Sequence, residues 1–439
     1  MKTRALAATA LLLSSTSVYA AGLDRSFQNV SSIFAPDNTL SFTFSHVSPS
    51  VTGTDALGAS YDVGESYEQT VLSFTKDFGE NFTLGFITDQ PFGADVFYNT
   101  DPTASTLGGT AADLSSEAYK LVGKYQFSPR FSLFGGIQAQ TVRASVNLNG
   151  VAYRNAIAAG GTARTFNSSL PPGVPTLSGA EIGSALSRAQ AAQAAGDLVA
   201  LGTIVASIDN VYGAGTFSNL QAGFTGASNA FLGDNGYSYS QDAQTEYGWL
   251  IGAAYEIPEI ALRLALTYHS SIDYTANTTE QILGNPVPGV VNFETPESVN
   301  IDFQTGIAKD TLLTASYRWT DFDAVDLIPT GLQSDLVNLD DGERFTLGVG
   351  RRFTENFSGS LTFSYEPEGD DDLVSPLGPT DGLFGISIGG RYTQDNMTIS
   401  GGINYSWLGD ARPEVGGQPV ASFTDNSSVA VGFKVDFTF

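Results

Sequence analysis

The sequence predicts an all-β fold: a 14-stranded antiparallel transmembrane β-barrel with a short N-terminal plug segment and a helical insertion in one external loop. Three observations predict it. Apolar residues recur at every second position over many segments, as they do in strands with one apolar face. Many of these segments are longer than the usual 5–6 residues. The connections between them alternate between short and long, which is typical of outer-membrane barrels.

The expected strands are even in number, as bacterial single-chain barrels require. Transmembrane barrel strands need about 9–11 tilted residues, and most of these segments meet that length. The expected ranges are 39–48, 67–78, 82–98, 115–127, 131–147, 244–256, 261–272, 297–308, 311–322, 343–353, 357–366, 383–393, 396–409 and 427–439.

The last strand and the strand at 311–322 show the two-sided pattern clearly. In the last strand, Val429 and Phe433 alternate with small or polar residues such as Ser428 and Lys434. In the strand at 311–322, Leu313 and the residues at every second position after it, up to Trp319, are apolar, whereas the residues between them, which include Arg318, are polar. We therefore expect one face of each strand toward lipid and the other toward the lumen.

Short connections at 77–81, 128–130, 257–259, 309–310, 354–356 and 394–395 put both termini at the end with the short turns, which is periplasmic in such barrels. Aromatic residues gather near both ends of the strands, as in the interfacial girdles of membrane barrels. Aromatic residues are common in any strand, so this feature supports the prediction without deciding it.

Composition excludes several classes of protein. The chain has 439 residues, no Cys, and 20 Lys+Arg against 46 Asp+Glu, for a formal charge of −26. Nucleic-acid binding requires clustered basic residues, so we expect no nucleic-acid partner. Without Cys there is neither a disulfide nor a thiolate metal site. The acidic run at 370–372 lacks the alternate-residue spacing of a calcium loop, so we expect no metal and no cofactor.

The N-terminus reads as a signal peptide over residues 1–20. Lys2 and Arg4 precede an apolar stretch, and 18–20 is a small-residue cleavage site. Residues 21–38 lack strand alternation and precede the barrel at 39–439, so they either enter the lumen as a plug or hang free. The predicted location is the bacterial outer membrane.

The connection at 149–243 is far longer than a barrel loop requires and contains two predicted short amphipathic helices. Ser178 and Glu181 have the spacing of a capping box. The apolar residues that follow at helical spacing either form a groove that captures a hydrophobic ligand or pack on one another as a structural lid. The candidate capture residues are Ile182, Leu186, Leu198 and Leu201.

The third strand is interrupted. Proline cannot donate a ladder hydrogen bond, and glycine within a strand commonly marks a bulge. Unpaired backbone in a membrane wall is costly unless it lines a cavity or is paired elsewhere. The break therefore forms either a side exit or a simple kink above the membrane plane, and its residues are Pro91, Phe92, Gly93 and Ala94.

This order of features resembles the FadL/TodX family of outer-membrane transporters for long-chain fatty acids and other hydrophobic compounds. The matching stretches are 21–22, 40–55, 81–98 with the interrupted strand, 119–146, the helical insertion after it, and 247–273. The resemblance implies a lateral outlet at the interrupted strand and a basic residue near a bound carboxylate, which falls on Arg143. The family's Asn-Pro-Ala hatch motif is reduced here to Ala35-Pro36-Asp37.

The predicted function is passive transport of hydrophobic molecules, most of all long-chain fatty acids, with release into outer-membrane lipid through the third strand. Arg143, Arg263 or Arg318 would select the carboxylate head, or each is paired with an acidic neighbour. We expect a monomer and no enzymatic activity. The alternatives are a general polar-solute porin and a lipid hydrolase; for the latter the only His bases are His46 and His269, and neither sits in a recognisable nucleophile motif such as G-x-S-x-G.

Overall fold

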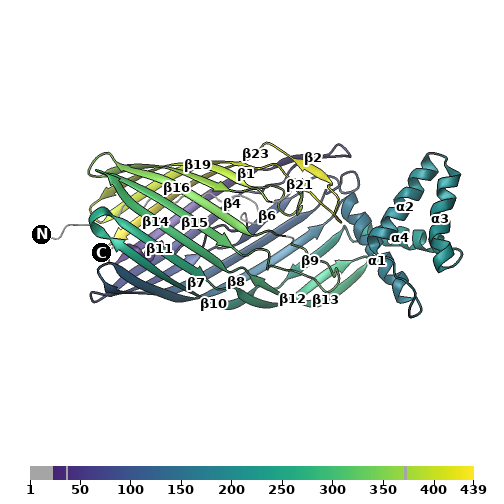
Figure 1. Cartoon of the computed structure of the whole chain (residues 1–439), viewed down its shortest axis with the longest axis horizontal. Helices are drawn as coiled ribbons and strands as arrows, with labels where there is room; N and C mark the ends of the chain where they lie inside the picture. The colour runs from purple at the N-terminus through teal and green to yellow at the C-terminus, as the bar shows by residue number, and fades with distance from the viewer. Residues whose placement is uncertain (1–22, 36–37, 338, 370–372) are drawn as a thin grey trace.

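In the computed structural model, which describes residues 23–35, 38–337, 339–369 and 373–439, antiparallel strands close into a barrel (Figure 1). Fourteen staves form the wall when the two halves of the interrupted strand are counted together. The staves are β1 (Thr39–Ser50), β4 (Tyr67–Phe78), β5 (Phe82–Asp89) with β6 (Gly93–Phe97), β7 (Ala111–Ser128), β8 (Phe131–Leu148), β10 (Gln244–Ile257), β11 (Leu262–His269), β14 (Ser298–Ala308), β15 (Thr311–Thr320), β16 (Gly342–Arg352), β17 (Phe357–Glu366), β19 (Leu383–Gln394), β20 (Met397–Leu408) and β23 (Asn426–Thr438).

The last stave pairs with the first, which closes the sheet. The register runs from Thr39↔Thr438 to Ser50↔Ser427 without a shift. The short turns, including the 3-10 helix η2 (Pro258–Ile260), lie at the end of the barrel that also holds the start of β1 and the C-terminus (Figure 1). We call this the short-turn end and the opposite one the long-loop end. Closure leaves no unpaired edge between the first and last strands, as a bilayer requires.

The two faces of the staves differ as the alternation predicts. In β23, Val429, Val431 and Phe433 point outward and are exposed, whereas Ser428 and Ala430 are buried. The outer surface is apolar because lipid rather than water covers it. Polar side chains therefore collect inside, where they bond to one another.

Additional strands at the long-loop end were not among the expected ones. A hairpin of β12 (Ile272–Ile282) and β13 (Asn285–Thr295) extends the wall beyond β11, and β9 (Tyr237–Gln241) joins β8 to β12. The turn residues of the β12–β13 hairpin, Leu283 and Gly284, have positive φ angles. Short strands in the loops pair separately: β2 (Thr52–Asp55) with β3 (Ser60–Asp62) and β22 (Ala421–Phe423), and β18 (Leu373–Val374) with β21 (Arg412–Pro413).

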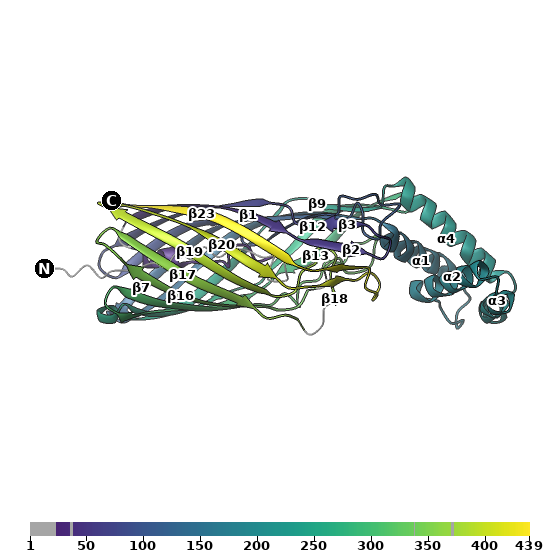
Figure 2. The ribbon, with the colours of Figure 1, turned by 90° about the horizontal axis from the view of Figure 1, so that it is seen from above.

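The insertion between β8 and β9 folds into four helices instead of the two expected. They are α1 (Val151–Ser168), α2 (Gly179–Ala194), α3 (Leu198–Tyr212) and α4 (Thr216–Gly233). They project beyond the long-loop end as an arm instead of lying over the mouth (Figures 1 and 2). The predicted capping box is present at the start of α2, where Ser178 and Glu181 bond reciprocally. Among the described helices none is by itself long and apolar enough to span a membrane; α3 and α4 meet that test only together, with a bend of 102°.

The described part of the N-terminal segment lies within the barrel. Its 3-10 helix η1 (Ser31–Phe34) places Ile33 and Val30 in an apolar cluster with Ile87, Val122 and Phe134 of the wall. The ring of Phe34 meets that of Phe134 edge to face, with centroids 5.6 Å apart. The predicted signal peptide and residues 21–22 and 36–37 of the predicted plug lie outside the described residues.

Candidate functional site: a broken stave beside an apolar cavity

The third stave stops at Asp89 and resumes at Gly93, as its proline and glycine predict. β5 pairs with β4 only from Phe78 back to Ser73, and β6 pairs with β7 alone among the described staves. The upper part of β4 therefore lacks a ladder partner on this side. Two side chains of the broken stave replace that ladder: the Thr88 hydroxyl and the Gln90 amide oxygen accept main-chain N–H groups of β4 at 2.9 Å. Along β4 itself the broken wall is thus held by side chains. Backbone bonds join β6 only to the residues just before β4, where the Glu65 N–H donates to the carbonyl oxygen of Asp95 at 3.2 Å and the Phe97 N–H donates to that of Val63 at 3.1 Å.

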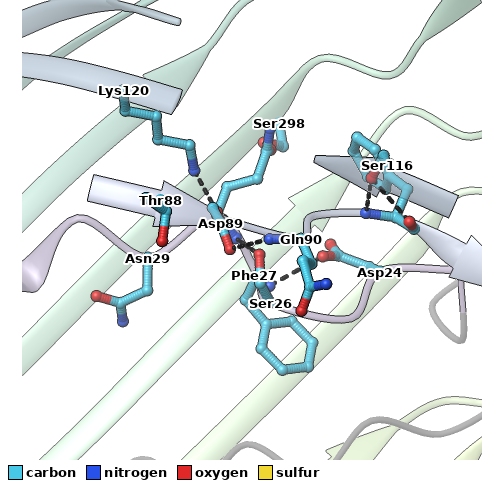
Figure 3. A network of polar contacts seen from close by, with 12 residues as sticks. Asp24, Ser26, Phe27, Asn29, Thr88, Asp89, Gln90, Ser116, Lys120 and Ser298 are labelled. Atoms are coloured by element: carbon cyan, nitrogen blue, oxygen red, sulfur yellow. Dashed lines mark hydrogen bonds and ion pairs between the residues drawn. The ribbon is translucent and has the colours of Figure 1, made fainter. Parts of the chain in front are cut away.

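Backbone groups at the break find partners inside the barrel. The N–H of Arg25 donates to the carbonyl oxygen of Pro91 at 2.8 Å, and the N–H of Gly93 donates to that of Leu23 at 3.0 Å. On the other side, the Ser116 hydroxyl accepts from the Phe92 N–H at 2.7 Å (Figure 3). The N-terminal segment therefore acts as a short substitute strand along the break, which meets the backbone requirement of a membrane wall.

Arg25 bridges the two edges of the broken wall. Its guanidinium pairs with Asp95 of β6 at 2.6 Å and stacks over the ring of Tyr67 of β4 at 3.8 Å from the centroid. Gly93 permits this approach, since a Cβ there would lie 2.6 Å from the guanidinium carbon. We call Arg25, Tyr67, Gly93 and Asp95 the latch.

A cavity of about 450 Å³ lies against the latch on the long-loop side. The loops after β15 and β17 roof it, while Leu23, Phe92 and the latch form its floor. Phe92 is buried and meets Phe322 with ring centroids 6.1 Å apart. The other apolar lining residues come from the wall and the loops: Ala94, Leu114, Val142, Val146, Phe293, Val325, Leu327, Val337, Leu339, Leu373, Val374 and Leu377.

The charge around this cavity is strongly acidic. Arg25 is the one basic residue among the described lining residues, and it is already paired with Asp95. Ten acidic residues line the same space: Glu65, Asp95, Asp113, Glu294, Asp340, Asp341, Glu343, Glu366, Glu368 and Asp381. Glu366, which is buried, is paired with Arg344 at 2.6 Å. This environment disfavours a carboxylate and accommodates an uncharged apolar molecule.

A second cavity, of about 230 Å³, surrounds the N-terminal segment nearer the short-turn end. Its lining is polar and its charge is reversed. The basic residues that line it are Arg25, Arg318, Arg344, Arg391 and Lys434; the acidic ones are Asp89, Asp302 and Asp436. A molecule that moves from the first cavity to the second passes the N-terminal segment.

The three carboxylate candidates lie in different places. Arg143 is exposed on the outward parity of β8 and donates to the Ser115 hydroxyl, so the lumen position expected for it is wrong. Arg263 faces inward but is covered by the Phe34 ring and bonded to Gln304. Arg318 is buried and bonded to Asp24, Ser298, Asn300 and Gln28. Only Arg318 lines a cavity, and there it anchors the N-terminal segment.

The four capture candidates divide between two environments. Ile182 is buried, and Leu186 and Leu201 pack in the same cluster at the core of the arm, so these three form the structural packing that the sequence left as the alternative. Leu198 at the start of α3 is 76% exposed. The helices bury the first three because their apolar stripes face one another.

Sequence reasoning missed two parts of the site. Asp24 and Arg25 lie in a segment without any pattern, and their partners, Arg318 and Asp95, are 294 and 70 residues away in the chain. It also missed Lys120, which is fully buried and donates to Asp89 at 2.5 Å (Figure 3). A signal for Lys120 was present, because it is a lone charge on the inward parity between Ala118 and Val122.

Comparison with known proteins agrees with this architecture. The family model described as outer membrane protein transport protein (OMPP1/FadL/TodX) matches residues 39–439. The chain belongs to this family. Membership in the FadL/TodX family places the protein in the outer membrane of Gram-negative bacteria, among transport proteins for hydrophobic compounds. No curated protein matches the sequence.

Solved structures share the fold at low sequence identity. A Pseudomonas aeruginosa FadL homologue superposes with a TM-score of 0.63 at 11% identity, over 93% of this chain and 91% of that one. The Pseudomonas putida toluene transporter TodX gives 0.58 at 14%, over 97% and 96%. The Ralstonia pickettii toluene transporter TbuX gives 0.57 at 13%, over 97% and 95%. At these identities the likeness establishes the barrel fold alone.

Proposed function

We propose that this FadL/TodX-family protein passively transports uncharged hydrophobic molecules, which rest in the apolar cavity and leave through the broken stave into outer-membrane lipid. The observation that carries the proposal is the position of the cavity: its floor is the latch, and the latch fills the part of the wall where β4 and β6 have no backbone ladder. A molecule that displaces Arg25 gains a path between the two strands.

Burial of the ligand supplies the driving force for binding. Each CH₂ removed from water contributes about 0.8 kcal/mol, so an eight-carbon chain gains roughly 6 kcal/mol before ordering and association costs. No energy source is required, since the molecule moves from water to lipid. The two solved toluene transporters with this fold favour the same class of ligand for the present chain.

Long-chain fatty acids, which the sequence placed first, become the second candidate. A carboxylate in the first cavity faces ten acidic side chains, and its single basic neighbour is already paired. The second cavity, with five basic residues against three acidic ones, is the observation that favours a fatty acid, since a carboxylate head suits it. The two candidates therefore differ in the charge of the ligand that is carried.

Uptake by a Gram-negative host that lacks its own transporters for these compounds tests the proposal. The compared solutes are labelled toluene, labelled palmitate and a labelled disaccharide. We expect toluene uptake to depend on the protein, and to fall several-fold when Pro91→Val restores a backbone donor at the break, with Gly93 kept so that the latch stays in place. A matched change in another strand, Pro288→Val, controls for general effects on folding.

Each other outcome points to a different function. Palmitate uptake that exceeds toluene uptake would favour the fatty-acid transporter. Disaccharide flux that is indifferent to the repair would make the protein a general porin and contradict the proposal. Release of free acid from an esterified lipid would support the hydrolase alternative.

A further inference from the structure

Three long polar side chains inside the wall have no hydrogen-bond partner in the described part of the chain. They are Gln138 and Gln140 of β8 and His269 of β11, all at most 1% exposed and all on the inward parity. Both amide atoms of each glutamine and both ring nitrogens of the histidine are unpaired. Buried polar groups are almost always bonded, because an unmade hydrogen bond leaves the cost of desolvation without compensation.

Strand register brings the three together with the buried ion pair. Gln138 is opposite Lys120 of β7 on one side and opposite Gly248 of β10 on the other. His269 is opposite Leu250, the next inward residue of β10. Strands are about 4.8 Å apart and residues about 3.4 Å apart along a strand, so the backbones of Gln138 and His269 lie roughly 12 Å from each other across β10. We call Gln138, Gln140 and His269 the polar layer.

The polar layer lies directly beneath the apolar cavity. Val142, the next inward residue above Gln140 on β8, lines that cavity and packs with Ile272 and Tyr274. Phe134, below the layer on β8, and Leu250, beside His269, belong to the cluster that seats the N-terminal segment. Unpaired polar groups between two apolar clusters lower the stability of the ligand-free protein. A polar group of a bound ligand would supply the hydrogen bonds that they lack.

The donors and acceptors of the polar layer determine which ligand group can bind there. An amide carries both donors and acceptors, and a neutral imidazole carries one of each. A hydroxyl both donates and accepts, so it matches this set, whereas a carboxylate only accepts and an ammonium only donates. The charge of Lys120 is already balanced by Asp89 at 2.5 Å.

We propose that the polar layer is a binding subsite for the hydroxyl group of an uncharged hydrophobic alcohol or phenol, whose apolar body occupies the cavity above. This inference rests on the proposed function, because the same cavity holds the ligand body. It adds that the protein distinguishes ligands by an uncharged polar head. No residue of the latch takes part, so the subsite is separate from the exit.

Matched probes test the subsite. Affinities of 1-octanol and octane are measured on the purified, folded protein in nanodiscs by displacement of an environment-sensitive fluorescent ligand, with octanoate as a third probe. A hydroxyl buried without partners weakens binding by about tenfold or more. We expect 1-octanol to bind the wild type at least as tightly as octane, and octanoate to bind more weakly than both.

Variants then locate the effect. Gln138→Leu with Gln140→Leu removes the partners at similar side-chain volume, and we expect the ratio of octanol to octane affinity to fall by about tenfold. Gln126→Leu is the matched control, because Gln126 of β7 also lies on the inward face of the wall but near the short-turn end. It should leave the ratio unchanged.

The results that overturn the subsite differ from those that overturn the proposed function. Wild-type protein that binds octane at least tenfold more tightly than 1-octanol would contradict the subsite without any variant, since the hydroxyl then finds no partner. An unchanged ratio in the double variant would contradict it as well and leave ordered water as the occupant. If the wild-type protein binds neither 1-octanol nor octane, that result would instead contradict the proposed function.

Discussion

At the residue scale, one carboxylate explains how the loops near the mouth are held. Asp55, at the end of β2, accepts hydrogen bonds from the Tyr61 hydroxyl at 2.5 Å and from the Thr106 N–H at 2.8 Å. Burial by itself raises the pKa of Asp55, but the bonds from Thr106, Tyr61 and Ala59 outweigh it and hold the pKa below its ordinary value. The same contact raises the pKa of Tyr61, where burial is the larger cause. The charged carboxylate thus links the β2–β3 sheet to the loop that contains Thr106.

This link should depend on pH. Because the folded pKa of Asp55 is lowered, its stabilising contribution is complete above the ordinary aspartate pKa of about 3.9 and is lost as the pH falls through the lower folded value. We expect the protection of the Thr106 amide against hydrogen exchange, corrected for intrinsic rates, to be constant from pH 7 to 5 and to drop only below the ordinary aspartate pKa of about 3.9. Asp55→Asn should show weaker protection without this pH dependence. A protection factor in wild-type protein that stays flat to pH 2 would contradict the assignment.

Gly93 shows what one residue can indicate before the fold is known. Its position in an alternating strand, two residues after Pro91, correctly predicts an interruption of the wall. The reason that glycine is required there is the approach of Arg25, and that contact joins residues 68 positions apart. The sequence pattern therefore identified where the strand is interrupted, and only the packing identified Arg25 as the residue that approaches Gly93.

At the element scale, the N-terminal segment is held mainly by buried polar contacts. Arg318 binds Asp24 and Gln28 from this segment and Ser298 and Asn300 from β14. The carbonyl oxygen of Phe27 accepts from the Asn300 amide at 2.9 Å. These bonds, together with Ile33 in its apolar cluster, keep residues 23–35 within the lumen. We infer that the segment restricts the passage of small solutes through the barrel.

Removing Arg318 should release this segment while the barrel stays closed. Arg318→Gln leaves the buried Asp24 carboxylate without its cation, and breaking such a pair costs about 3–5 kcal/mol. The chain has no Cys, so a single Ser26→Cys change reports the exposure of the segment. We expect the rate of labelling by a water-soluble maleimide to rise by more than tenfold in Arg318→Gln.

The control for this prediction is Arg143→Gln, because Arg143 is exposed and contacts neither Asp24 nor the lumen. It should not change the labelling rate. Adding Asp24→Asn to Arg318→Gln should partly restore protection, since it removes the unpaired charge. Equal labelling of the parent and Arg318→Gln proteins would show that the apolar contacts of η1 alone hold the segment.

The strands and helices also differ in how closely the sequence pattern predicts their bounds. Staves such as β23 are predicted nearly to the residue, because alternation with period two survives wherever lipid covers one face. The β12–β13 hairpin has alternation too, but it follows β11 after only two residues, and one strand of 261–272 was expected there. The α1 helix contains Gly160-Gly161, which weakens its helical signal; packing of Ala163 against Phe217 and Leu220 stabilises it instead.

At the scale of the whole molecule, the four helices of the arm pack around one apolar cluster. Ala163 of α1 packs with Leu220 of α4, and the Asn149 amide donates to the carbonyl oxygen of Asn235 at 2.8 Å, so α1 and α4 run antiparallel from a common base. The α2 helix lies alongside α1, where Gly179 meets Gly160, and α3 lies at the outer end of the arm (Figure 2). The second half of α1 contacts the loop after β15 through Arg164, which donates to the carbonyl oxygen of Leu332.

This arrangement predicts that α2 and α3 can be removed without effect on the barrel. Replacing residues 169–215 by a short Gly/Ser linker should leave the barrel with the thermal stability of the full-length protein, as measured by its heat-modifiable mobility. Since Ile182, Leu186 and Leu201 pack within the core of the arm, we expect toluene uptake to be unchanged. A marked fall in uptake, reproduced by Leu198→Ser alone, would instead support capture of ligand by the exposed start of α3.

The sequence by itself determined the barrel, the number of its staves, the short-turn end and the place where the third stave breaks. These features depend on local alternation and on proline and glycine, which act within a few residues. The choice of ligand was decided by tertiary structure, because the cavity collects ten acidic residues from strands and loops spread over more than 300 residues of the chain. The partners of Arg318 and Arg25 were decided in the same way: a closed barrel brings all its inward side chains to one lumen, whatever their separation in sequence.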